Sequence, residues 1–275
     1  MTRSTRALAS LLCGALCFLL AASVHAVEFQ FDDAGGLPAY GYASTGKPKP
    51  DTKYLLVIGI HPNEASDGQG AGGAAKLANE FPDVIVLGPT FASPLALARK
   101  AERPVQTEDY FQSAGPVHEE KVTALIEQVG KVWPIYPKVV LHGFSGGAQF
   151  SQRYAMKNPD RVAGVAAHSA GTWSRLDGTD KINPEAKDML FFISCGEGDV
   201  EFSSKGAPFN RINAARKFNE ELKSLKFEPV FKTWPRTGHQ FTPGAYGMTK
   251  ELVQLVREKN GVVDDKNKTP TKGKK

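Results

Sequence analysis

The sequence predicts a three-layer α/β fold, in which a mostly parallel central sheet has helices on both faces. Short apolar runs rich in β-branched residues alternate with helix-like segments along the chain, and this order is typical of layered α/β domains. The runs are continuously apolar, as expected of strands that are covered on both faces. Residues 27–258 are numerous enough to bury the core of one large domain.

The expected elements follow one another without an internal repeat or a linker between domains. Residues 27–32 and 37–43 predict a hairpin at an antiparallel edge of the sheet. The apolar runs KYLLVIGI, DVIVL, KVVLH, VAGVAA, MLFFISC and PVFKTW predict strands at residues 53–60, 83–87, 138–142, 162–167, 189–195 and 229–234. Helices are expected at residues 71–80, 119–132, 148–157, 211–225 and 249–258.

The segment 88–117 does not fit this alternation. It reads GPTFASPLALARKAERPVQTEDYFQSAGPV, which is too long for an ordinary connection between a strand and a helix. Inserts of this length often carry function, so a lid or a pocket wall is one interpretation. A packed surface excursion is the other.

The first 26 residues predict a signal peptide. Arg3 and Arg6 precede an apolar run at residues 7–22, and the small residues before Val27 fit cleavage after Ala26. The run would form a helix of about 24 Å, shorter than the roughly 30 Å hydrocarbon layer, so no stable membrane anchor is expected. The expected location is periplasmic or secreted. Only Cys195 remains after cleavage, which excludes an internal disulfide.

The net positive charge comes from the two ends of the chain. The formal net charge is +5, the leader contributes two arginines, and residues 259–275 contain six lysines and two aspartates, which leaves residues 27–258 near −1. The tail is predicted to be a disordered basic segment. It either solubilises the chain or contacts anionic surfaces. No basic stripe with interleaved aromatics occurs in the core, so no nucleic-acid partner is expected.

The stretch VVLHGFSGGAQ places Ser145 between a predicted strand and a predicted helix. Gly143 and Gly147 give it the G-x-S-x-G spacing of a nucleophile elbow. In so tight a turn, the residues two before and two after the serine approach too closely for a Cβ. The hydroxyl would then stand at the start of the helix, where the dipole and free N–H groups favour negative charge. Ser145 is therefore the expected nucleophile, and a purely structural turn is the alternative.

A serine hydroxyl needs a base and a group that orients the base. His239, in WPRTGHQFTPG after the last predicted strand, is the expected base. Asp199, in the Gly-rich loop after MLFFISC, is the expected acid, and Glu197 is the weaker choice because it lies so close to the strand end. The other histidines are expected to leave with the signal peptide (His25), pack in the core (His142), have a structural role or else line the site (His168), lie on the surface (His118) or brace a loop (His61).

At these positions the chain resembles the serine hydrolases of the α/β-hydrolase fold. GFSGG, the GEGD loop and the GHQF loop match that family's nucleophile, acid and histidine positions. The stretch HGFSGGAQFSQRYAMKNPDRVAGVAAHSAGTW also resembles secreted esterases of the polyhydroxybutyrate-depolymerase and feruloyl-esterase type. Extracellular depolymerases are commonly rich in cysteine, whereas only Cys195 remains here, so a polymer substrate is in doubt.

The resemblance also implies an oxyanion hole. Gly146 can offer one N–H, and the family's second donor comes from the loop that here begins Ile60-His61-Pro62-Asn63. Proline has no N–H to give, so Asn63 is expected to be the second donor, with Glu64 as the alternative. Substrate walls are expected from a set of aromatic residues, each of which could instead fill the core: Phe144, Trp173 and Phe241, with Tyr110 and Phe111 of the insert.

These residues predict an exported enzyme that cleaves small-molecule or oligomeric carboxylic esters through an acyl-enzyme, with no metal or organic cofactor. An amidase or peptidase with the same three residues is one alternative. A non-catalytic periplasmic binding protein on a hydrolase scaffold is the other, because a fold does not guarantee a function. The oligomeric state does not follow from the sequence.

Overall fold

The structure of the chain is a computed structural model that describes residues 27–31, 38–62, 71, 73–106, 109–173, 180–184, 186–202 and 208–262. The predicted leader, Asn63 and residues 263–275 of the predicted tail lie outside these ranges. None of the helices in the described ranges is both long enough and apolar enough to cross a membrane.

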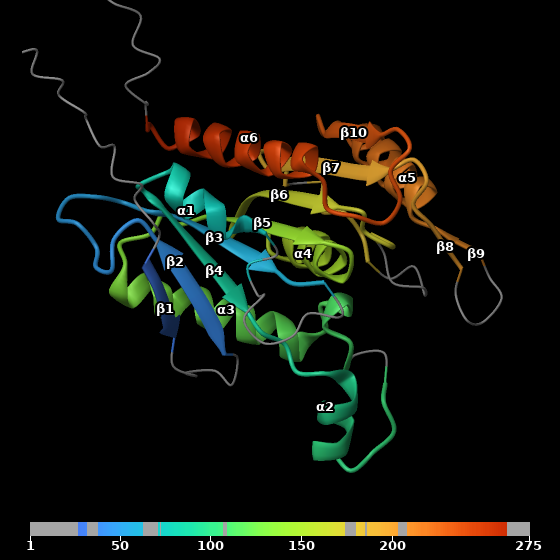
Figure 1. Cartoon of the computed structure of the whole chain (residues 1–275), viewed down its shortest axis with the longest axis horizontal. Coiled ribbons are helices and arrows are strands. Elements are labelled where there is room, and N and C mark those ends of the chain that lie inside the picture. The colour runs from blue at the N-terminus through green and yellow to red at the C-terminus, as the bar shows by residue number, and fades with distance from the viewer. Residues whose placement is uncertain are drawn as a thin grey trace, which may run out of the picture.

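The central sheet has the predicted architecture (Figure 1). Its strand order is β1-β2-β4-β3-β5-β6-β7-β10. The first two pairings, β1 with β2 and β2 with β4, are antiparallel, and the remaining pairings are parallel. The strands are β1 (Val27–Phe31), β2 (Ala39–Ala43), β3 (Leu55–Ile60), β4 (Val84–Pro89), β5 (Val139–Phe144), β6 (Val162–His168), β7 (Leu190–Gly196) and β10 (Val230–Trp234).

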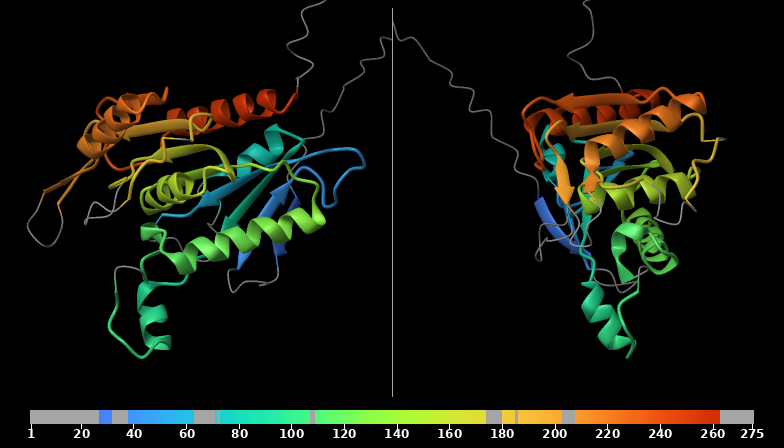
Figure 2. Two further views of the ribbon diagram at one scale, coloured as in Figure 1. Left: turned by 180° about the vertical axis from the view of Figure 1, so that it is seen from behind. Right: turned by 90° about the vertical axis from the view of Figure 1, so that its right-hand side faces the viewer.

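Helices cover both faces of the sheet, which confirms the predicted three layers (Figures 1 and 2). One face packs on α3 (Pro116–Val132), α4 (Gly146–Lys157) and α5 (Arg211–Ser224). The other packs on the 3₁₀ helix η1 (Ala74–Lys76), α1 (Leu77–Glu80) and α6 (Pro243–Lys259). In the central strands successive side chains enter opposite cores, so Leu55 and Val57 lie in one and Leu56 and Ile58 in the other. This explains why these runs are apolar throughout.

The helices differ from their predicted bounds, and α6 differs most. α6 begins at Pro243, six residues before the predicted start, because the Thr242 hydroxyl accepts a hydrogen bond from the Ala245 N–H at 3.0 Å and proline occupies the first helical position. The predicted helix at 71–80 is shorter, and the structure has only η1 and α1 there.

Part of the insert forms a helix that the sequence analysis did not predict. α2 (Pro94–Lys100) begins with a hydrogen bond from the Ala96 N–H to the Ser93 hydroxyl and projects away from the sheet (Figures 1 and 2). Beyond it, the Arg103 guanidinium binds both carboxylate oxygens of Asp109, at 2.8 and 2.6 Å. The short 3₁₀ helix η3 (Phe111–Ser113) then leads back to α3. A short hairpin, β8 (Val200–Phe202) with β9 (Pro208–Asn210), was also not predicted.

The expectation that His118 lies on the surface is wrong. His118 is only 3% exposed, and its ring packs edge-on against Phe91 with the ring centroids 5.5 Å apart. α3 begins at Pro116, three residues earlier than predicted, which turns His118 toward the insert. Burial, and then the nearby cation Lys121, lower the pKa of His118 to about 4, although Asp109 acts in the opposite direction.

This histidine predicts a pH-dependent stability. The unfolded chain takes up a proton near pH 6.5 and the folded chain only near pH 4, so His118 weakens the fold as the pH falls through that window. Between pH 7 and 4.5 the loss should be about 2–3 kcal/mol. In His118→Phe, which keeps a ring but cannot be protonated, urea unfolding should lose correspondingly less stability over that interval. Equal losses in the two proteins would contradict this.

A buried ion pair ties α6 to the start of β4. The Arg257 guanidinium contacts the carboxylate of Asp83, with Nε 2.9 Å from Oδ2 and Nη2 2.8 Å from Oδ1, and lies over the Phe81 ring at 4.6 Å. Arg257 is 2% exposed. Removing one partner leaves the other as an uncompensated charge away from water.

Arg257→Leu should therefore lower the free energy of unfolding by about 3 kcal/mol. Arg161→Leu is the matched control, because it removes an arginine from the exposed pair with Glu127. That change should alter the free energy of unfolding by less than about 0.5 kcal/mol. Urea titration of both variants gives the comparison, and similar losses would contradict the prediction.

Candidate active site

The turn between β5 and α4 holds Ser145 in a backbone conformation that residues with a side chain rarely adopt. Its φ is 57° and its ψ is −122°, and strain of this kind tends to occur at functional sites. A Cβ on Gly143 would overlap the Gly147 backbone, as expected. A Cβ on Gly147 would instead overlap the Ile60 carbonyl at the end of β3. Both glycines are therefore required by close backbone approach, the second against a neighbouring strand.

The structure brings together the three residues predicted to form the catalytic group. The Ser145 Oγ lies 2.9 Å from His239 Nε2, and His239 Nδ1 lies 3.0 Å from Asp199 Oδ2. An ionised carboxylate only accepts, so the assigned tautomer has Nδ1–H donating to Asp199 and Nε2 accepting from the serine hydroxyl. Asp199 is 1% exposed and Ser145 is 7% exposed, whereas the His239 side chain is 34% exposed. The imidazole can thus be reached by a substrate while the acid is shielded.

The loops after β7 and β10 are held against one another. A Cβ on Gly196 would overlap the carbonyls of Thr237 and Gly238, and the Gly198 N–H donates to the Thr237 carbonyl at 2.9 Å. This contact places the acid beside the histidine. Glu197 faces away, because its carboxylate accepts a hydrogen bond from the Thr233 hydroxyl at 2.8 Å.

The carboxyl of Asp199 stays ionised in spite of its burial. Burial alone raises its pKa, but hydrogen bonds from His239 and Ser169, with the charges of His239 and Arg211, outweigh that effect and hold the pKa below its ordinary value. Cys195 also directs its thiol at Asp199 Oδ2, at 3.6 Å. Burial, and then the charge of Asp199, raise the pKa of that thiol to about 12, which keeps it protonated.

Of the five aromatic residues predicted to line the substrate pocket, Phe111 is buried against Phe91, Tyr110 is exposed, and the other three lie in different places. The Phe144 ring stacks on the His239 ring, with centroids 4.7 Å apart and planes at 27°. The Phe241 ring packs against two buried histidine rings, with its centroid 5.3 Å from that of His142 and 5.5 Å from that of His168. Trp173 stacks on Phe218 of α5 at 5.5 Å. Phe144 and Phe241 are thus near the imidazole, and the pocket role of all three stays a prediction.

A buried polar cluster beneath Phe241 accounts for two of the remaining histidines. Thr249 Oγ1 lies 3.0 Å from His142 Nδ1 and 2.9 Å from His168 Nε2, and His168 Nδ1 lies 2.8 Å from Ser194 Oγ. All four residues are at most 1% exposed. Burial, and then the neighbouring His142, hold the pKa of His168 well below its ordinary value, so it is neutral. The structural roles expected of His142 and His168 are confirmed.

The predicted oxyanion donors are only partly within the described ranges. Gly146 is the first residue of α4, directly after Ser145, while Asn63 and Glu64 lie outside the described residues. His61 does brace this region, because its Nε2 accepts from the Phe91 N–H at 3.0 Å and its Nδ1 lies 2.7 Å from the Pro62 carbonyl. Burial lowers the pKa of His61 despite that bond to Pro62, so a neutral ring joins the end of β3 to the insert.

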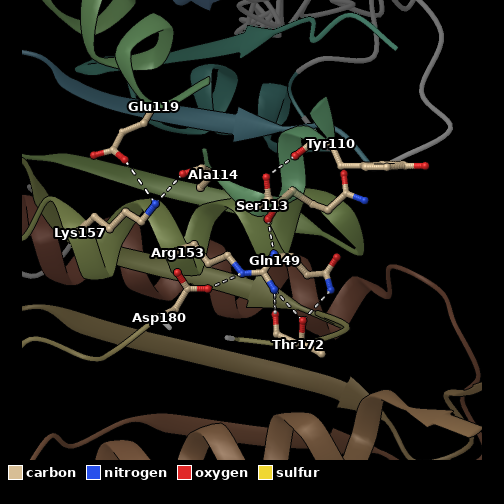
Figure 3. Close-up of polar contacts among 10 residues, drawn as sticks. Tyr110, Ser113, Ala114, Glu119, Gln149, Arg153, Lys157, Thr172 and Asp180 are labelled. Atoms are coloured by element: carbon tan, nitrogen blue, oxygen red, sulfur yellow. Dashed lines mark hydrogen bonds and ion pairs between the residues drawn. The ribbon is translucent and has the colours of Figure 1, made fainter. Parts of the chain in front are cut away.

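Side chains one turn apart on α4 anchor the surrounding loops to the nucleophile helix (Figure 3). Arg153 donates to the Gln112 carbonyl and, at 2.6 Å, to the Thr172 hydroxyl, and it pairs with Asp180 at 3.4 Å. Lys157 donates to the Ala114 carbonyl at 2.7 Å. The insert and the loop after β6 are therefore both attached to the helix that follows Ser145. Sequence analysis missed this role, since neither side chain has a distinctive local signal.

The chemistry of this arrangement is that of an activated hydroxyl. Within the described ranges, no group of three His, Cys, Asp or Glu side chains is arranged to hold a metal ion. What is assembled is a serine hydroxyl, an imidazole and a buried carboxylate in sequence, beside the N-terminus of a helix. Such a group can transfer an acyl unit.

Comparison with solved structures identifies the fold as the α/β-hydrolase fold. A CE1 ferulic acid esterase from Anaeromyces mucronatus, in complex with ferulic acid, has a TM-score of 0.60 at 16% identity, over 83% of this chain and 89% of that chain. Poly(aspartic acid) hydrolase-1 from Sphingomonas has a TM-score of 0.52 at 19% identity, over 84% and 98%. Esterase PE8 has a TM-score of 0.51 at 16% identity, over 85% and 100%. No family model and no curated protein matches the sequence.

Proposed function

We propose that the chain is an exported serine hydrolase that cleaves carboxylic esters through an acyl-enzyme. The observation that carries this proposal is the continuous set of hydrogen bonds from Ser145 through His239 to Asp199, at 2.9 and 3.0 Å. The strained backbone of Ser145 adds support, because strain of this kind clusters at functional sites. Similar structures include ferulic acid esterases and other esterases, which favours an ester as the substrate. The signal peptide predicted at residues 1–26 supports export.

In the proposed mechanism, Ser145 Oγ attacks the acyl carbon while its proton passes to His239 Nε2. Asp199 orients the imidazole and stabilises the cation that forms. The N–H of Gly146 donates to the oxyanion, with Asn63 as the proposed second donor, and each well-aimed donor contributes about 3–4 kcal/mol. His239 then gives its proton to the departing alcohol. A water molecule, deprotonated by the same histidine, releases the acid and regenerates Ser145.

An amide is the second candidate for the scissile bond. One of the similar structures is a poly(aspartic acid) hydrolase, and the same three residues would cleave an amide if the amine leaving group were protonated in time. A matched panel of p-nitrophenyl esters and p-nitroanilides of the same acids separates these candidates. We expect higher kcat/KM on the esters, and a preference for the anilides would favour the second candidate.

The nucleophile is tested by a fluorophosphonate probe and mass spectrometry. One label should appear on the peptide that contains Ser145 and should be lost in Ser145→Ala. Ser151→Ala is the matched control, since that serine lies on α4 and is buried, and it should keep the label. Folded wild-type protein that neither reacts with the probe nor turns over any ester would refute the proposal and favour a binding protein on this fold.

A further inference from the structure

The carboxylate of Asp199 is contacted from four different elements. His239 reaches Oδ2 from the loop after β10, and the Cys195 thiol reaches the same oxygen from β7. The other oxygen, Oδ1, lies 3.6 Å from the Nε of Arg211, the first residue of α5. A hydrogen bond from the Ser169 side chain, at the end of β6, completes the set. Of these residues, only His239 was predicted as a site residue from the sequence.

Arg211 is placed against the usual preference of helices. It occupies the first position of α5, where the helix dipole disfavours a cation, and its side chain is only 11% exposed. No acidic residue lies in the first turn of that helix. The charge that compensates this placement is Asp199, and a rule broken locally at a buried position often marks a site with a role.

Ser169 is strained in the same region. Its φ is 50°, in the left-handed region, and its N–H donates to the Ser194 carbonyl at 2.7 Å. The preceding carbonyl, of His168, accepts from the Ser145 N–H at 3.0 Å. Two successive residues at the end of β6 therefore contact the nucleophile turn on one side and the acid on the other, which sets the spacing between them.

We propose that Arg211 and Ser169 are positioning residues for Asp199, which fix its carboxylate and offset part of its negative charge. This inference rests on the proposed function. Asp199 is only 1% exposed, so its ionised carboxylate needs a cation beside it, and Arg211 is one that stays charged whatever the state of His239. A permanent cation there also offsets part of the attraction of Asp199 for a protonated imidazole.

Few charged or titratable groups in the described ranges act on Asp199 and on the neighbouring Cys195. The charged or titratable ones that act on Asp199 and Cys195 are Arg211, His239 and each other. Glu197 is bonded to Thr233 and His168 to Thr249 and Ser194, so both face elsewhere. Within the described ranges, removing Arg211 therefore takes away a permanent cation that lies 3.6 Å from Asp199 Oδ1.

The test is the pH dependence of the rate at which a fluorophosphonate probe labels Ser145. In Arg211→Gln the acid-side midpoint should move up by about half a unit to one unit, because the carboxylate then holds the imidazole proton more tightly. Arg216→Gln removes the same charge from an exposed position on the same helix and should leave the midpoint unchanged. The inference would be overturned if the midpoint of Arg211→Gln were equal to or lower than that of wild type, or if Arg216→Gln shifted the midpoint equally.

Two more variants keep the test decisive if Arg211→Gln does not fold. Arg211→Lys keeps the charge but loses the planar fork, so kcat for p-nitrophenyl acetate should fall severalfold while the midpoint stays. Ser169→Gly accepts the positive φ and removes the hydroxymethyl side chain, and kcat should fall about tenfold with KM within twofold. Wild-type kcat in both would overturn the inference. If wild-type protein is not labelled, the proposed function has failed as well, whereas an active wild type with unaffected variants refutes only this inference.

Discussion

Replacing His239 with alanine should lower kcat/KM for a p-nitrophenyl ester by at least about 10⁴. His239 Nε2 lies 2.9 Å from the Ser145 hydroxyl, and within the described ranges the other histidines do not supply a base there. His142 and His168 are engaged with Thr249, and His61 is bonded to Phe91. Without a base, the attacking group is a neutral alcohol rather than an incipient alkoxide.

The control for this variant is the neighbouring exposed residue. Gln240→Ala alters the same loop next to the imidazole and should keep kcat/KM within about threefold. Thermal unfolding should give similar Tm values for wild type and both variants, because the His239 side chain is 34% exposed. Activity of His239→Ala within tenfold of wild type would contradict the assigned base and point to a different proton acceptor.

Asp199→Asn tests the third member of the group separately. An amide side chain can donate to His239 Nδ1 and so favour the opposite tautomer, with a loss of about 10⁴ in kcat expected.

The pKa of Asp199 is held below its ordinary value, so its contribution to stability is present above the unfolded-state pKa and is lost as the pH falls through the folded-state pKa.

Gly147→Ala should lower the free energy of unfolding by about 3 kcal/mol or more, or prevent folding altogether. The added methyl would overlap the carbonyls of Ile60 and His61, and these are backbone atoms of a buried strand and its end, which cannot rotate away. Any folded fraction should lose about 10² or more in kcat, because the shift would displace the Ser145 turn and the Gly146 N–H together.

Gly247→Ala is the matched control. Gly247 lies within α6, and a Cβ there would meet no atom within 4 Å. Alanine favours helix over glycine, so this variant should gain about 0.5–1 kcal/mol. Urea unfolding should show changes in the free energy of unfolding of opposite sign for the two variants. A stable and fully active Gly147→Ala would show that the turn can relax.

The sequence predicted the elements that depend on local pattern. Continuous apolar runs located the central strands, since a strand covered on both faces must be apolar at every position. The helix limits were less certain. The threonine and proline before Gly244 were a capping signal that the prediction of a helix at 249–258 overlooked.

The prediction of the catalytic residues also depended on local sequence. Ser145 was marked by flanking glycines, and Asp199 and His239 each occupy a loop directly after a strand. Parallel strands end at one edge of a sheet, so the order of such loops along the chain is enough to bring their side chains to one region. Their hydrogen-bond distances, however, required coordinates.

By itself, the sequence determined the layered α/β class and the three residues proposed for catalysis, because both follow from periodicity and from turns of a few residues. Only the tertiary structure decided that His118 is buried, that Thr249 joins two histidines, and that Ser169 and Arg211 face Asp199. These contacts join residues far apart in the chain or on separate elements. Their partners are set by how helices and strand ends pack, and no local pattern of residues encodes that packing.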